Sequence, residues 1–372
     1  MARKLKSDRL LFLTTLVLVA AGVVMVYSAS KVLVMEQNGQ PNVFPTKQAL
    51  FAAFGLAAMF VAMRLDYQLY REPRVVLSVV GFTLAALVAV LILGPKINNT
   101  RRWFYVGGSG IQPSEFAKIA MILFTAAVLE RRMDRIDDLK HSLGPIAAVL
   151  VPVLGLILLQ PDFGSSMAVL VIVTVMVFAA GVPHRYFIGI GLSLVPVVAV
   201  AAMWAPYRMR RLMAFWNPWE NRFNDGFQVV QSLIAVGTGG VAGRGLGDSV
   251  QKLFYLPYPY SDFIYAVVAE ELGLVGASLM LACFCVITWR GLQTAAHAPD
   301  AFGSFLALGL TTMIAVQAFV NISVVLGLLP TKGIPLPFIS AGGSSLIMSL
   351  AGMGVLLNIS QRVSATTTTR GA

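Results

Sequence analysis

Long apolar runs alternate with short polar segments along the whole chain. A run of about 20 apolar residues is long enough to cross the hydrocarbon core of a bilayer, which is about 30 Å thick. Such runs predict transmembrane helices over residues 10–30, 46–63, 75–94, 114–130, 143–159, 164–181, 186–204, 262–289, 303–326 and 341–360. The pattern therefore predicts an all-α polytopic membrane protein with about ten transmembrane helices.

Composition agrees with this pattern. Of the 372 residues, 57% are hydrophobic and 12% are charged, whereas soluble domains have about 25% charged residues. A net charge of +11 is compatible with nucleic-acid binding, but no soluble segment is long enough to form a basic binding face. Basic cytoplasmic loops explain the charge better, and we expect no nucleic-acid partner.

Two basic loops set the predicted orientation. Residues 64–74 and 130–142 are rich in arginine and lysine, which places them in the cytoplasm together with both termini. The first run exceeds the roughly 7–15 residues of a signal-peptide core, so we predict an uncleaved first span. Residues 1–362 then form one membrane domain, and the low-complexity residues 363–372 are predicted to be a disordered cytoplasmic tail.

One long polar segment, residues 205–261, falls on the outer side in this orientation. It is too polar to face lipid and too short to be an ordinary folded domain. Its mixture of arginine and tryptophan is typical of interfacial elements. We therefore predict a large extracytoplasmic loop with short amphipathic helices.

The predicted outer side is also rich in cations, against the usual bias. These are Arg101, Arg102, Arg208, Arg210, Arg211, Arg222, Arg244, Lys252 and Lys332. Long loops escape the bias, but Arg101, Arg102 and Lys332 lie in short ones. A cationic rim suits an anionic ligand such as a lipid-linked pyrophosphate, with phospholipid headgroups as the alternative ligand.

Charged residues inside the apolar runs are informative, because an ionised group in hydrocarbon is costly unless it is paired or hydrated. Glu115 and Lys118 are spaced i, i+3, so they can meet on one helix face. We favour a structural ion pair over direct chemistry for them. Asp162 follows Pro161 between two runs and is predicted to cap the second helix.

A further group of acids lies in the stretch YLPYPYSDFIYAVVAEELG, residues 255–273. With Ser261 as the helix cap, Asp262 is left at the membrane boundary as a candidate general base whose pKa rises through desolvation. The aromatic residues predicted to surround it are Phe254, Tyr255, Tyr258 and Tyr260. The alternative is that Asp262 itself is a helix cap. Glu270 and Glu271 either bind a cation or bond to neighbouring helices, and the residues do not decide which.

Five segments resemble the SEDS family (shape, elongation, division, sporulation). They are RRWFYVGGSGIQPSEFAK, QPDFGSS, QSLIAVGTGGVAGRGLG, YSDFIYAVVAEELGLVG and LLPTKGIPLPFISAGGSS. They occur in the family's order, and the resemblance covers about residues 8–362. The KLFYLP sequence and Lys332 resemble the division members more than the elongation members.

The resemblance implies a peptidoglycan glycosyltransferase that polymerises lipid II at the outer face of the bacterial cytoplasmic membrane. Its second substrate is the glycan chain linked to undecaprenyl pyrophosphate. Implied partners are a class B penicillin-binding transpeptidase and other division proteins at the septum, and a divalent cation (Mg²⁺ or Mn²⁺) is a candidate cofactor. A lipid II flippase and a non-catalytic division scaffold are the alternatives, although a flippase needs a polar path across the whole bilayer.

The resemblance places the family's essential aspartate on Asp262. The substrate contacts that we expect are Arg102, Trp103, Gln112, Glu115, Lys118, Arg244, Lys252, Lys332 and Ser340. The chain departs from the family where Tyr258 and Tyr260 replace the usual Glu and His, and where Ala341 replaces Tyr. We therefore assign no second catalytic acid.

Overall fold

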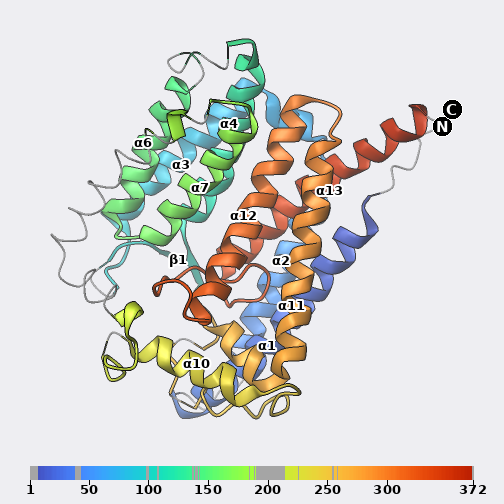
Figure 1. The fold of residues 1–372 in the computed structure, drawn as a ribbon. Helices are drawn as coiled ribbons and strands as arrows, with labels where there is room; N and C mark the ends of the chain where they lie inside the picture. The colour runs from blue at the N-terminus through green and yellow to red at the C-terminus, as the bar shows by residue number, and fades with distance from the viewer. Residues whose placement is uncertain are drawn as a thin grey trace.

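The chain folds into a bundle of long helices with a short helix across one end (Figure 1). The computed structural model describes residues 7–37, 43–97, 100–106, 109–135, 138, 141, 143–183, 185–187, 189, 214–224, 226–253, 255–257 and 259–370. The long helices are α1 (Arg9–Gln37), α2 (Val43–Arg64), α3 (Pro73–Leu93), α4 (Pro113–Arg132), α6 (Gly144–Leu159), α7 (Phe163–Ala179), α11 (Ile264–Ala296), α12 (Ala301–Val325) and α13 (Gly343–Arg370). The smaller elements are η1 (Tyr67–Arg71), β1 (Phe104–Val106), β2 (Ser109–Ile111), η2 (Met133–Arg135) and α10 (Phe227–Gly239).

Each of these long helices coincides with a predicted span. Helices α1, α2, α3, α11, α12 and α13 are long and apolar enough to cross a membrane, whereas α6 and α7 are apolar but shorter. The predicted span over residues 186–204 lies almost entirely outside the described residues. The chain is an all-α integral membrane protein.

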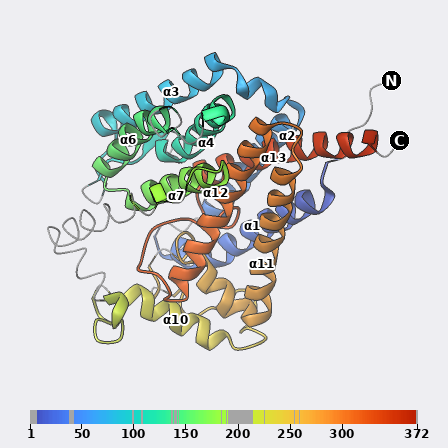
Figure 2. The same cartoon turned by 45° about the horizontal axis from the view of Figure 1, so that its top comes forward.

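Helix α12 is at the centre of the bundle. It packs against α4, α7, α10, α11 and α13, and the views in Figures 1 and 2 agree on this position. Its apolar span is 72% buried, against 28% for that of α3. Polar side chains on α12 are therefore held away from lipid.

Polar contacts join several elements where α1 begins. The Asp8 carboxylate accepts a hydrogen bond from the Leu11 amide at 3.1 Å and pairs with Arg290 of α11 at 2.6 Å. The Asp8 amide donates to Ser360 of α13 at 3.2 Å. These contacts fasten α1, α11 and α13 to one another at the end of the bundle opposite α10 (Figure 1).

Helix α11 is interrupted at Gly273, where φ is 66° and ψ is −166°. The interruption frees backbone groups on both sides, and the loop after α10 satisfies them. The carbonyls of residues 270–271 accept from the amides of residues 244–245, and the amides of residues 274–275 donate to the carbonyls of residues 240–241, at 2.9–3.2 Å. A broken helix is tolerated at membrane depth when neighbouring backbone replaces the lost bonds.

Helix α10 belongs to the predicted extracytoplasmic loop and lies across the end of the bundle (Figures 1 and 2). Val229, Val230 and Ala235 are buried, and the Ser232 hydroxyl donates to the carbonyl of Val325 in α12 at 2.7 Å. The prediction of short helices in this loop is confirmed for residues 227–239. Residues 205–213 lie outside the described residues.

The end of α13 differs from the prediction. The helix continues to Arg370, where we predicted disorder from residue 363. An existing helix extends without a new nucleation step, because each added residue gains one backbone hydrogen bond. The low-complexity composition of this segment did not reveal that continuity.

Candidate active site

Asp262 lies in the turn that leads into α11, two residues before the helix begins. Phe263 occupies the N-cap position, and among the described residues no side chain caps this helix. The prediction that Ser261 is the cap is therefore wrong. Its hydroxyl bonds to the Asp262 carboxylate, and its carbonyl accepts from Ser340 Oγ at 2.6 Å. The alternative in which Asp262 is the cap is excluded by the same geometry.

Burial among protein atoms raises the pKa of Asp262 from 3.8 to about 6. The negative charge of Asp162 raises this pKa further, while the hydrogen bond from Ser261 opposes the rise. The side chain retains partial access to solvent. At neutral pH the carboxylate is therefore mostly ionised, yet it is more basic than an ordinary aspartate.

Asp162 caps α7, as predicted. One carboxylate oxygen accepts from the Ser165 amide at 3.1 Å. The other accepts from Gln112 Nε2 at 2.8 Å and from Ser114 Oγ at 3.2 Å. Asp162 thus joins the beginnings of α4 and α7, and both of its oxygens are engaged.

Residues 332–333 approach this end of the bundle from the loop before α13. A Cβ atom at Gly333 would lie 3.0 Å from Asp262 Oδ2, so the absent side chain lets the backbone come close to the carboxylate. Lys332 Nζ lies 3.6 Å from the centre of the Phe163 ring, at the first residue of α7. Lys332 and both aspartates therefore belong to one cluster.

Arg102 fastens the β1–β2 segment to the turn before α7. Its Nε donates to the Gln160 carbonyl at 2.7 Å, and its Nη2 donates to the Pro161 carbonyl. The neighbouring Trp103 packs over Gly110, where a Cβ atom would lie 2.8 Å from the indole ring. Substrate contacts by Arg102 and Trp103 stay predictions.

Glu115 and Lys118 form the predicted ion pair on α4. Lys118 Nζ lies 2.7 Å from Glu115 Oε1, and both side chains are buried. Lys118 also donates to Gln317 Oε1 of α12 at 3.2 Å. The pair therefore links α4 to the central helix.

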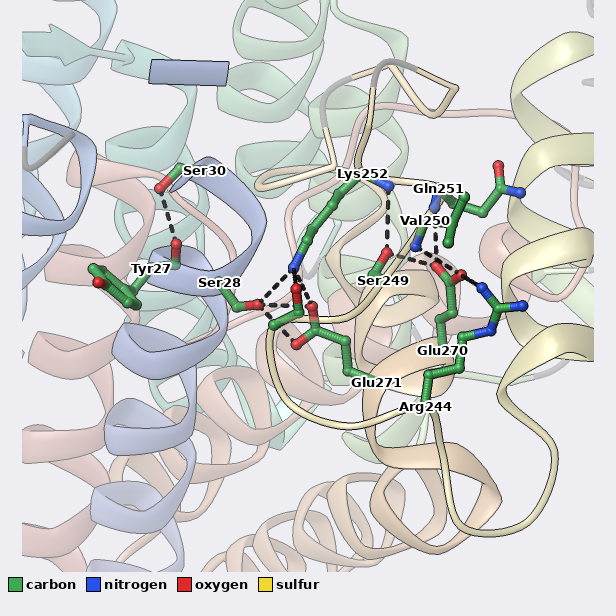
Figure 3. A network of polar contacts seen from close by, with 11 residues as sticks. Tyr27, Ser28, Ser30, Arg244, Ser249, Val250, Gln251, Lys252, Glu270 and Glu271 are labelled. Carbon is green, nitrogen blue, oxygen red and sulfur yellow. Dashed lines mark hydrogen bonds and ion pairs between the residues drawn. The ribbon is translucent and has the colours of Figure 1, made fainter. Parts of the chain in front are cut away.

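A second buried network lies further along α11, at Glu270 and Glu271 (Figure 3). Lys252 Nζ pairs with Glu271 Oε1 at 2.7 Å and donates to the Gly247 carbonyl at 2.6 Å. Ser28 Oγ of α1 donates to both oxygens of Glu271 at 2.7 and 2.8 Å. This network holds the loop after α10 against α1 and α11.

Glu270 forms the other half of the network (Figure 3). Its carboxylate accepts from Ser249 Oγ at 2.5 Å and from the Val250 amide at 3.0 Å. Arg244 Nη1 lies 3.7 Å away. The sequence left open whether Glu270 and Glu271 bind a cation or bond to neighbouring parts of the chain. In the structure both carboxylates bond to side chains and backbone groups of the chain itself. Lys252 and Arg244 pair with these carboxylates, and their predicted contacts with substrate stay predictions.

The fold and these motifs agree with one protein family. The cell cycle protein family of FtsW, RodA and SpoVE matches residues 8–365. The chain belongs to this family. It is 43% identical over 359 residues to the stage V sporulation protein E of Bacillus subtilis, with 96% of this chain and 98% of that protein covered. It is 42% identical over 361 residues to the probable peptidoglycan glycosyltransferase FtsW of Geobacter metallireducens, with 97% and 96% covered.

Solved structures of family members have the same fold. A chain of a peptidoglycan synthase complex that coordinates polymerisation and crosslinking has a TM-score of 0.80 at 29% identity, with 96% of this chain and 99% of that chain covered. The rod shape determining protein RodA of Thermus thermophilus has a TM-score of 0.69 at 30% identity, with 96% and 97% covered.

The structure of this family member differs from the sequence analysis at two points around Asp262. Of the predicted aromatic wall, Tyr260 is partly buried against the core, whereas Tyr255 is 52% exposed. Phe254 and Tyr258 lie outside the described residues. Asn321 was missed, although it is the side chain that holds the Asp262 carbonyl, at 2.8 Å. An asparagine inside an apolar run was the signal for it.

Proposed function

We propose that this membrane protein is a peptidoglycan glycosyltransferase that polymerises lipid II with Asp262 as the general base. The observation that carries the proposal is the placement of Asp262 before α11, with a pKa raised to about 6 by burial and with no role in capping the helix. The family and its named relatives support the activity: seven of eight similar relatives are probable peptidoglycan glycosyltransferases, including those of Geobacter metallireducens and Coxiella burnetii.

The proposed reaction inverts the configuration at the anomeric carbon. The 4-hydroxyl oxygen of the N-acetylglucosamine of an incoming lipid II bonds to the anomeric carbon of the chain-end N-acetylmuramic acid. The bond from that carbon to the pyrophosphate oxygen breaks, and undecaprenyl pyrophosphate leaves. The Asp262 carboxylate accepts the hydroxyl proton. Since the leaving group is already activated, one positioned base and cationic stabilisation are sufficient.

Two of the predicted cations, Lys332 and Arg102, lie beside the turn that carries Asp162. Lys332 Nζ lies 3.6 Å from the centre of the Phe163 ring, next to Asp162, and the neighbouring Gly333 approaches the Asp262 carboxylate. Arg102 is bonded to two backbone carbonyls. We therefore propose Lys332 as the main contact for the departing pyrophosphate, with Arg102 shaping the turn beside it.

The proposal includes a divalent cation only as an ion that binds together with the pyrophosphate of the substrate. Among the described residues, no group of three or more His, Cys, Asp or Glu side chains could hold a metal ion. Mg²⁺ commonly uses one or two carboxylates together with substrate phosphates. When bound, it would neutralise the charge that develops on the leaving group.

The proposal extends to orientation and partners. Both termini are cytoplasmic, the end of the bundle with Asp262 faces outward, and the protein works at the division septum beside a class B penicillin-binding protein. The relative found in a peptidoglycan synthase complex supports such a partner. No contact in the described part of the chain favours the lipid II flippase or the scaffold.

The test is polymerisation by purified protein. Asp262→Asn should lower the rate of glycan-strand synthesis from lipid II by about 10²- to 10⁴-fold, while the protein melts at a temperature no lower than that of the wild type. A variant that polymerises at the wild-type rate would show that Asp262 is not the general base. If the wild-type protein makes no strands, the proposed activity is wrong.

A further inference from the structure

Three consecutive carbonyl groups just before α11 are each held by another part of the chain. The Tyr260 carbonyl accepts from the Ala341 amide at 2.9 Å. The Ser261 carbonyl accepts from Ser340 Oγ at 2.6 Å. The Asp262 carbonyl accepts from Asn321 Nδ2 at 2.8 Å. We call the side chains of Asn321 and Ser340 the clamp.

Asn321 is well suited to hold a backbone in one place. It is 1% exposed on the central helix α12, and its Nδ2 donates both to the Asp262 carbonyl and to the Ile334 carbonyl, each at 2.8 Å. The opposite amide orientation would set an oxygen against two carbonyl oxygens, so these partners fix the side chain. Asn321 thereby locks the Asp262 turn to the loop before α13.

Ser340 is fixed equally firmly. Its hydroxyl oxygen accepts from the Leu336 amide at 2.8 Å while it donates to Ser261. The turn that presents it has the buried Phe338 at a φ of 65°, a strained conformation for a bulky residue that persists only when its surroundings hold it. Gly22 of α1 lies against this turn, where any side chain would collide with the Phe338 carbonyl.

We infer that Asn321 and Ser340 are positioning residues that set the distance between the Asp262 carboxylate and the attacking hydroxyl group. The inference rests on the proposed function of Asp262. Their hydrogen bonds go to the backbone carbonyls of residues 261 and 262, so both act through the backbone that carries the carboxylate. Because a displacement of about 1 Å can slow a reaction by about 10²-fold, loss of the clamp should lower kcat while substrate binding is retained.

The chain offers a matched control for Asn321. Asn358 is also a buried asparagine that bridges backbone groups, accepting from the Tyr67 amide at 3.1 Å and donating to the Met63 carbonyl at 2.9 Å, but it lies among the contacts at the opposite end of the bundle. We compare Asn321→Leu with Asn358→Leu in lipid II polymerisation and thermal melting. The melting temperatures should fall by similar amounts, since each variant loses one buried bridge. Only Asn321→Leu should lower kcat, by about 10- to 100-fold, with KM for lipid II within about threefold of wild type.

A second pair of variants, Ser340→Ala and its control Ser232→Ala, tests the inference if Asn321→Leu does not fold. Ser340→Ala removes one hydroxyl bond to a carbonyl, and Ser232→Ala removes the equivalent bond from Ser232 to Val325 (2.7 Å). Ser340→Ala should lower kcat by about three- to tenfold and Ser232→Ala should not. Equal kcat values in each pair, or a rise in KM without a fall in kcat, would overturn the inference. Failure of the proposed function is separate, because Asp262→Asn would then polymerise normally.

Discussion

Asp262 lies within ten residues of Glu270 and Glu271 at the start of α11, but the surroundings of its carboxylate differ from theirs. Glu270 and Glu271 are 0% and 1% exposed, and serine, backbone and cationic donors reach their oxygens. Asp262 is held by its backbone, its carboxylate receives a hydrogen bond from Ser261, and the nearby Asp162 raises its pKa. Burial alone therefore does not distinguish a structural acid from a candidate general base.

The difference follows from where the positive charge is used. Lys252 and Arg244 are aimed at the glutamates, so that network is close to neutral and complete. Around Asp262, the charge that shifts its pKa is the negative charge of Asp162, whose oxygens are already engaged by α4 and α7. A carboxylate under these conditions binds a proton more tightly than usual, as a general base requires.

The largest expected effect concerns the completed network. Lys252→Met should destabilise the fold by about 3–5 kcal/mol, because it leaves the Glu271 carboxylate buried without its cation. The double variant Lys252→Met/Glu271→Gln should recover most of that loss. Thermal melting of the wild type, both single variants and the double variant measures the coupling. A single variant as stable as the wild type would show that the network is not structural.

The network also shows what the sequence could not predict. The spans, the Glu115–Lys118 pair and the Asp162 cap depend on spacing within one segment, and they were predicted. The partners of Glu270 and Glu271 depend on the interruption at Gly273, which lets the loop after α10 enter beside α11. A single glycine in a long apolar run signals a break only weakly. Arg244 and Lys252 were predicted to contact substrate as members of the cationic rim, and their carboxylate partners were missed.

The clamp was missed for a similar reason. Asn321 and Ser340 lie 59 and 78 positions after Asp262 in the sequence, and no local pattern joins them. The sequence located the catalytic candidate because an acid in an apolar chain stands out. It did not locate the side chains that hold the backbone of that acid.

A smaller effect on stability should appear at Asp262 and depend on pH. Its pKa is raised from 3.8 to about 6 in the fold, so the ionised group favours the unfolded chain, and stability is lost as the pH rises through 6. Asp262→Asn should therefore stabilise the protein at pH 8 by about 1–2 kcal/mol, less than the full shift implies because the side chain is partly solvated. The gain should shrink as the pH falls toward 4. Melting curves at pH 8 and pH 4.5 test this, and a destabilised Asp262→Asn at pH 8 would mean that the carboxylate is structural.

The central claim is that Asp262 reacts as a base whose pKa is set by its surroundings, and the pH dependence of polymerisation tests it most directly. The rate at saturating lipid II, measured from pH 5 to pH 8 with wild-type protein, should rise nearly tenfold per pH unit below 6 and level off above about 7. The residual activity of Asp262→Asn should lack this rise. A wild-type rate that does not change between pH 5 and pH 7, or a rise that persists in Asp262→Asn, would contradict the account.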